Sequence, residues 1–311
     1  MKKFQKMAMI ALLAISTIAC DSDDDAAPAP QTITDIAAAN PNFSTLVTAL
    51  QRTGLDDVLD APGSYTVFAP TNAAFTTFLS GANVNDVPVP VLTQILLNHV
   101  VSGTVQSSQL TTGYIETLAT FNGVANGSNL NMYVNTADGV ELNGVSTVTT
   151  ANIIASNGVI HVVDAVIGLP TVVTFATADP NFSSLVTTLT SPGQPDFVSV
   201  LSGAGPFTVF APTNAAFTAL GTELAAIPLV PSAAQITEVL EYHVVSGNVL
   251  SSSLTNNQVV TTIQGGTFTI GLTGGAKITD ANARVSNIIA VDVQAANGVI
   301  HVVDKVLLPT L

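Results

Sequence analysis

Three motifs occur twice in this chain, in the same order. They are Thr-Val-Phe-Ala-Pro-Thr-Asn-Ala-Ala-Phe-Thr at 66–76 and 208–218, His-Val-Val-Ser-Gly at 99–103 and 243–247, and Asn-Gly-Val-Ile-His-Val-Val-Asp at 157–164 and 297–304. The two copies of each motif lie 140 to 144 residues apart. That spacing exceeds the ~20–50 residues of a solenoid repeat and suits a whole domain of ~100–150 residues. The sequence therefore predicts two copies of one domain, at 31–169 and 170–311.

The first residues are typical of an exported protein. Three lysines precede an apolar stretch at 7–18, which is shorter than the ~20 residues of a membrane-spanning helix and suits a signal peptide at 1–19. Ala19 and Cys20, the only cysteine, follow this stretch and resemble the end of a bacterial lipobox, although Thr17 stands where leucine is usual. We expect Cys20 to be lipidated. The alternative is a soluble secreted protein with an incidental thiol.

Residues 20–30 form an acidic, proline-containing tether that cannot bury a core. An acidic run directly after a lipidated cysteine resembles the surface-export signals of some Gram-negative lipoproteins. In other bacteria an aspartate at that place retains the protein at the inner membrane. We expect an outer-membrane, surface-exposed protein, with a periplasmic or secreted one as the alternative.

The charge balance excludes several partners. Removal of residues 1–19 takes away three of the seven basic residues and none of the 21 acidic ones, which leaves a net charge of −17. Nucleic acid requires a basic footprint, which this chain lacks, so no nucleic-acid partner is expected. Anionic lipid attracts basic segments, so contact with the membrane is expected only through the lipid anchor on Cys20. Charged residues make up only 9% of the chain, and tryptophan is absent. An uncharged polar surface follows, which suits an extracellular protein and is compatible with glycan contacts.

The first motif predicts a strand that runs into a helix. Thr66, Val67 and Phe68 favour an extended segment, and Pro70 keeps the residue before it extended. Thr71 is placed to cap the following helix, with Phe75, Phe78 and Leu79 on one of its faces, and Thr213 and Asn214 repeat the Thr71-Asn72 pair. Asn40-Pro41 and Asp179-Pro180 predict earlier helix starts. These features are all explained by folding.

The four histidines all lie inside repeated motifs, at His99, His161, His243 and His301. Zinc requires three or four ligands, usually with cysteines or carboxylates at short spacing, and no such cluster occurs in the sequence. We therefore expect each imidazole to bond backbone groups in a partly buried place, and we expect no metal and no cofactor. A recognition role is the main alternative.

Together these motifs resemble the fasciclin domain, over nearly all of 31–169 and 170–311. The resemblance implies an α+β fold in which each domain is a wedge of two β-sheets with capping helices. It also implies extracellular adhesion. In animal relatives, a Tyr-His pair and an Asp-Ile pair before the last Asn-Gly have been linked to integrin binding.

Candidate recognition residues follow from that resemblance. Tyr242 and His243 match the Tyr-His pair, whereas the first domain has Asn98 before His99. The Asp-Ile position is Asn152-Ile153 in the first domain and Asp292-Val293 in the second. Because neither domain keeps both pairs, we do not extend integrin recognition to this chain. We expect a structural role for these residues, with recognition as the alternative.

The sequence thus predicts a non-enzymatic, lipid-anchored adhesion or matrix-interaction protein. No Gly-x-Ser-x-Gly elbow, phosphate-binding glycine loop or paired-histidine metal motif occurs in the sequence. The expected partners are extracellular or cell-surface proteins or polysaccharides. The alternative function is glycan capture by an accessory lipoprotein of surface carbohydrate uptake.

Overall fold

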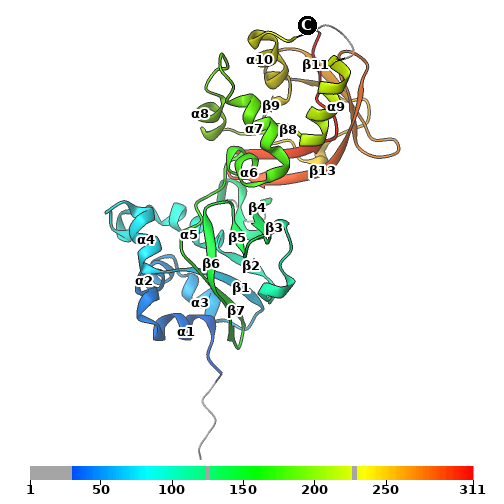
Figure 1. The fold of residues 1–311 in the computed structure, drawn as a ribbon. Coiled ribbons are helices and arrows are strands. Elements are labelled where there is room, and N and C mark those ends of the chain that lie inside the picture. The colour runs from blue at the N-terminus through cyan, green and yellow to red at the C-terminus, as the bar shows by residue number, and fades with distance from the viewer. Residues whose placement is uncertain (1–29, 124–126, 226–229, 311) are drawn as a thin grey trace, which may run out of the picture. The chain divides into compact units, whose positions relative to one another are not determined.

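The computed structural model describes residues 30–123, 127–225 and 230–310. The predicted signal peptide, Cys20 and nearly all of the tether lie outside the described residues. Among the described residues the same succession of helices and strands occurs twice (Figure 1).

The first domain begins with helices and ends with strands. Its helices are α1 (Ile33–Ala39), α2 (Ser44–Thr53), α3 (Leu55–Asp60), α4 (Asn72–Leu79) and α5 (Val89–Leu97). Its strands are β1 (Tyr65–Pro70), β2 (Val100–Ser102), β3 (Gly113–Thr120), β4 (Asn129–Asn135), β5 (Glu141–Leu142), β6 (Ser146–Ala155) and β7 (Gly158–Val163).

The second domain repeats this order. Its helices are α6 (Val172–Ala178), α7 (Ser183–Leu189), α8 (Phe197–Ser202), α9 (Asn214–Ala225) and α10 (Ala233–Tyr242). Its strands are β8 (Phe207–Pro212), β9 (Val244–Ser246), β10 (Val259–Thr261), β11 (Thr267–Gly271), β12 (Lys277–Thr279), β13 (Val285–Ala295) and β14 (Gly298–Val303).

Each domain contains a seven-stranded sheet, with order β2-β1-β7-β6-β5-β4-β3 in the first and β9-β8-β14-β13-β12-β11-β10 in the second. The β1–β7 and β8–β14 pairs are parallel, and the other pairs are antiparallel. A long strand joins the two halves of each wedge. β6 pairs with β5 through its first residues and with β7 through the rest, and β13 does the same in the second domain. The α+β fold expected for each domain is confirmed.

Alternating side chains of β1 enter two different cores. Val67 and Ala69 pack among the helices, whereas Phe68 packs with Met132 and Leu142 inside the curved sheet. The second domain likewise has one core among its helices and another inside its sheet. Each sheet is therefore buried on both faces over its parallel pair of strands, β1 with β7 and β8 with β14.

The predicted helix signals of the repeated motif are confirmed, with one exception. Thr71 caps α4, and the chain enters the 3₁₀ turns at 41–43 and 180–182 with Asn40 and Asp179 as their caps. Phe75 is buried, but Phe78, which was expected on the same face of α4, is 40% exposed. α4 ends directly after Leu79, where Ser80 adopts a left-handed conformation.

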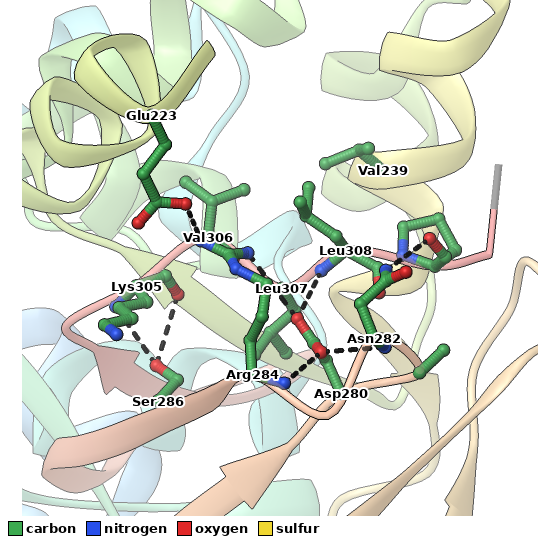
Figure 2. A network of polar contacts seen from close by, with 12 residues as sticks. Glu223, Val239, Asp280, Asn282, Arg284, Ser286, Lys305, Val306, Leu307 and Leu308 are labelled. Carbon is green, nitrogen blue, oxygen red and sulfur yellow. Dashed lines mark hydrogen bonds and ion pairs between the residues drawn. The ribbon is translucent and has the colours of Figure 1, made fainter. Parts of the chain in front are cut away.

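A polar network holds the segment that follows β14 (Figure 2). The carboxylate of Asp280 accepts hydrogen bonds from the backbone N–H groups of Arg284 and Leu308, at 2.9 and 3.1 Å. The Arg284 guanidinium donates to the Val306 carbonyl at 2.8 Å and to Glu223 of α9 at 2.6 Å. The network thereby ties the β12–β13 turn and α9 to the end of the domain.

Candidate functional site

The Thr-Asn pair of the first motif joins two helices in each domain. The Thr71 hydroxyl accepts from the Ala74 N–H at 3.3 Å. The Asn72 amide accepts from the Thr45 N–H at 2.9 Å and donates to the Pro41 carbonyl at 2.9 Å. Asn72 thus satisfies free backbone groups at the start of α2.

The second domain repeats these bonds. Thr213 accepts from the Ala216 N–H at 3.3 Å, and Asn214 accepts from the Ser184 N–H at 2.8 Å. Asn214 also donates to the Pro180 carbonyl at 2.9 Å. The polar atoms that the motif brings together are therefore engaged within each domain.

His99 and His243 follow the last helix of each domain and are buried. The Nδ1 atom of His99 lies 2.7 Å from the Ile95 carbonyl, to which it donates, and Nε2 accepts from the Ile167 N–H at 2.9 Å. His243 makes the same pair of bonds with Val239 and Leu307, at 2.7 and 2.9 Å. Each ring thus connects a helix to the segment that follows the last strand of its domain.

His161 and His301 lie on β7 and β14, next to a bulge in the neighbouring strand. Nδ1 of His161 accepts from the Asn152 N–H at 3.2 Å, and Nε2 donates to the Val105 carbonyl at 3.0 Å. His301 bonds Asp292 and Val249 in the same way, at 3.3 and 2.9 Å. This tautomer is the opposite of the one at His99 and His243.

Burial lowers the pKa of all four imidazoles. It brings the pKa of His99 and that of His243 to about 4, and it shifts the pKa values of His161 and His301 in the same direction. A neutral ring with both nitrogens bonded to backbone offers no free lone pair to a metal or a substrate. Among the described residues, no group of three or more His, Cys, Asp or Glu side chains could hold a metal ion.

The bulges contain two of the candidate recognition residues. Asn152 and Asp292 have left-handed backbones, with φ of 62° and 59°. The Asn152 side chain accepts from the Ser107 N–H at 2.9 Å, and the Asp292 carboxylate accepts from both the N–H and the hydroxyl of Ser251. Both side chains cap a short 3₁₀ turn, and Asn152 also remains exposed to solvent.

The other candidate recognition residues lie inside the domains. Tyr242 is buried, and its hydroxyl donates to the Thr267 carbonyl and accepts from the Ala281 N–H at 3.2 Å. Burial raises the pKa of this phenol. Ile153 is partly buried against the core of the first domain, and Val293 is buried in the second. The structure therefore does not bring the candidate recognition residues together on one accessible face.

Two asparagines have a larger role than their sequence pattern indicates. Asparagine followed by glycine is a common turn sequence, and Asn157 and Asn297 indicate no more than this by themselves. The buried Asn157 side chain accepts from the Ile33 N–H at 3.0 Å and donates to the carbonyls of Leu59 and Ala61, at 2.6 and 3.2 Å. Asn297 repeats this with Val172, Leu201 and Gly203. Asparagine occurs at both positions, although a turn alone would accept several residue types. This repetition was the signal in the sequence that could have indicated a further role.

The chain belongs to the fasciclin-domain family. The family model described as "Fasciclin domain" matches twice, at residues 41–170 and 180–309. In the part of the chain that the structure describes, no helix has both the length and the hydrophobicity to cross a bilayer.

Relatives occur in bacteria and animals. The chain is 41% identical over 140 residues to protein sll1483 of Synechocystis, which covers 44% of this chain and 72% of that protein. It is 31% identical over 269 residues to human periostin, and this match covers 82% of the chain but 29% of periostin. The fold is similar to that of a domain pair from the insect cell adhesion molecule fasciclin I, with a TM-score of 0.54, 22% identity, and coverage of 87% of this chain and 98% of that one.

Proposed function

We propose that this protein is a non-enzymatic adhesion or matrix-interaction module held at the bacterial cell envelope by a lipid on Cys20. The observation that carries this proposal is the use of the repeated polar residues. Their side chains bond backbone groups of their own domain, so each motif builds a scaffold and leaves recognition to the exterior. The membership in a family that includes a cell adhesion molecule supports the same conclusion.

The proposed partner is an extracellular or cell-surface protein or polysaccharide. A net charge of −17 after loss of residues 1–19 is unsuited to nucleic acid or to direct attraction by anionic lipid. Two similar domains on one tether would give avidity on a multivalent surface, because binding of the second domain becomes intramolecular.

Adherence of intact cells tests this function. Cells that produce the full chain, cells that lack it and cells in which it is restored would be compared on host-derived matrix and on biofilm-forming surfaces. We expect adherence to fall on deletion and to return on restoration. Equal adherence of all three strains, with equal amounts of protein in the two producing strains, would contradict adhesion.

A second candidate function is capture of glycans for uptake. An uncharged groove of about 460 Å³ in the first domain favours it. Growth on a supplied polysaccharide would depend on the protein under this candidate, whereas adhesion alone predicts the same growth with and without it.

A further inference from the structure

A groove runs between α2, α4 and the segment at 81–85 of the first domain. Its volume of about 460 Å³ lies within the ~300–1,000 Å³ typical of small-molecule sites. Leu79 and Ala82 contribute its accessible apolar part, whereas Phe75 and Val84 line it but are almost fully buried. Serine, threonine and asparagine side chains contribute its polar part, and no charged side chain lines it.

Several of these polar groups have free hydrogen-bonding capacity. The Thr45 hydroxyl and the side-chain amide of Asn85 make no hydrogen bond with any described residue. The side-chain oxygen of Asn83 accepts from the backbone N–H of Asn85 at 2.9 Å, and the side-chain N–H groups of Asn83 have no described acceptor. The Thr48 hydroxyl donates to the Ser44 carbonyl at 2.9 Å and keeps its capacity to accept. The groove therefore offers both donors and acceptors.

The wall at 81–85 is held in place from within the domain. Asp86 accepts from the Asn83 N–H at 3.0 Å and completes a capping box. The Arg52 guanidinium donates to the carbonyls of Val84 and Val87, at 2.9 and 2.6 Å. The groove is thus formed before a ligand arrives, which reduces the ordering cost of binding.

The second domain has a different wall at this place. α4 ends at Leu79 and the chain turns through Ser80 and Gly81, which have φ of 49° and 90°. α9 instead continues through 221–225, where Glu223 pairs with Arg284. Ser184 occupies the position of Thr45, as its N–H bond to Asn214 shows, and provides a matched control.

We propose that this groove of the first domain binds an uncharged saccharide. Sugars present hydroxyl groups that both donate and accept, together with apolar C–H faces, and the lining of the groove is complementary to both. Two modes of peptide binding, strand addition and recognition of an acidic motif, fit less well, because helices and a loop, not a free strand edge, form the walls, and no arginine lines them. The inference deepens the proposed function, on which it rests for access to saccharide outside the cell.

The purified full chain in detergent would be titrated by NMR with neutral tetrasaccharides of glucose, mannose, galactose and xylose, and with a galacturonic acid tetrasaccharide, to about 10 mM. We expect at least one neutral sugar to bind and to shift the amide signals of 44–48 and 81–85. The Thr45→Val, Asn85→Ala double variant removes two groups that have no described structural bond. It is expected to weaken binding by about tenfold or more, because two hydrogen bonds are lost. Ser184→Ala is expected to bind as the unchanged protein does.

The proposal would be overturned if none of the neutral sugars binds. Equal binding of the galacturonic acid probe, or equal loss in Ser184→Ala, would also overturn it, as would unchanged binding by the double variant. Adherence of the same variants separates this inference from the proposed function. If saccharide binding depends on the groove while adherence never depends on the protein, the saccharide site stands and the adhesion function fails.

Discussion

Each histidine of this protein acts as a connector between backbone segments. His99 and His243 connect a helix to the end of a domain, and His161 and His301 connect a strand bulge to a loop. Burial favours the neutral rings, and only a neutral ring can both donate and accept as these do. The sequence correctly indicated backbone partners, but the rings are buried and not partly buried as expected. It could not identify the partners, because His99 and its partner Ile167 lie 68 residues apart.

The pKa values of His99 and His243 make stability depend on pH. Both lie at about 4 in the folded chain and near 6.5 in the unfolded one, so only the unfolded chain gains these protons as pH falls from 6.5. The free energy of unfolding should therefore decrease between pH 6.5 and 4, by up to about 3 kcal/mol per histidine, and this contribution should level off below pH 4. Urea unfolding at several pH values measures this.

Replacement of His243 by glutamine provides the control for that pH dependence. The variant is less stable at pH 7, but its stability should fall less steeply between pH 6.5 and 4. The same slope in both proteins would show that other groups, such as carboxylates, cause the effect.

Asn157 should be among the residues most sensitive to truncation. Asn157→Ala leaves the buried Ile33 N–H and the Leu59 carbonyl without their partner, and should lower the free energy of unfolding by about 2–4 kcal/mol. The exposed Asn85→Ala should change it by less than about 0.5 kcal/mol. Urea unfolding compares the two, and similar values would contradict the role assigned to Asn157.

At the scale of elements, the sequence predicted best where the determinants are local. Thr71 and Thr213 lie directly before the helices that they cap, and the apolar residues of α2 recur at helical spacing. The groove could not be predicted, because it depends on where α4 stops and on how Arg52 holds a segment more than 30 residues away. The bulges were missed for a similar reason, since they arise from the pairing of β6 with β7 and of β13 with β14.

The caps should contribute equally in the two domains. Thr71→Ala and Thr213→Ala each remove a hydroxyl that accepts from an early helical N–H, so each should cost about 1 kcal/mol of unfolding free energy. Thr71→Ser keeps the hydroxyl and should cost less than half as much. Calorimetry of the three variants tests this, and an equal loss in Thr71→Ser would show that the methyl group matters more than the cap.

At the scale of the whole molecule, duplication made the fold predictable. Each motif occurs twice, and the spacing of the two copies gives the length of one domain. Surface function could not be predicted in the same way, because the repeated residues are those that the fold requires. The groove lies where the two copies differ, in the helix end and loop at 79–86.

The lipid anchor makes a separate prediction about location. With Cys20 intact, the protein should fractionate with membranes and require detergent for extraction. Cys20→Ser should take up no labelled fatty acid, whereas the unchanged protein should take it up, because the acyl chain is attached through the cysteine thiol. Equal fatty-acid labelling of both proteins, or none in either, would contradict lipid anchoring through Cys20.

Adhesion requires that both domains lie outside the cell. Protease treatment of intact cells, followed by detection of each domain and of a periplasmic marker, measures this most directly. We expect both domains to be lost while the periplasmic marker survives. Survival of both domains in intact cells, with digestion only after lysis, would contradict it.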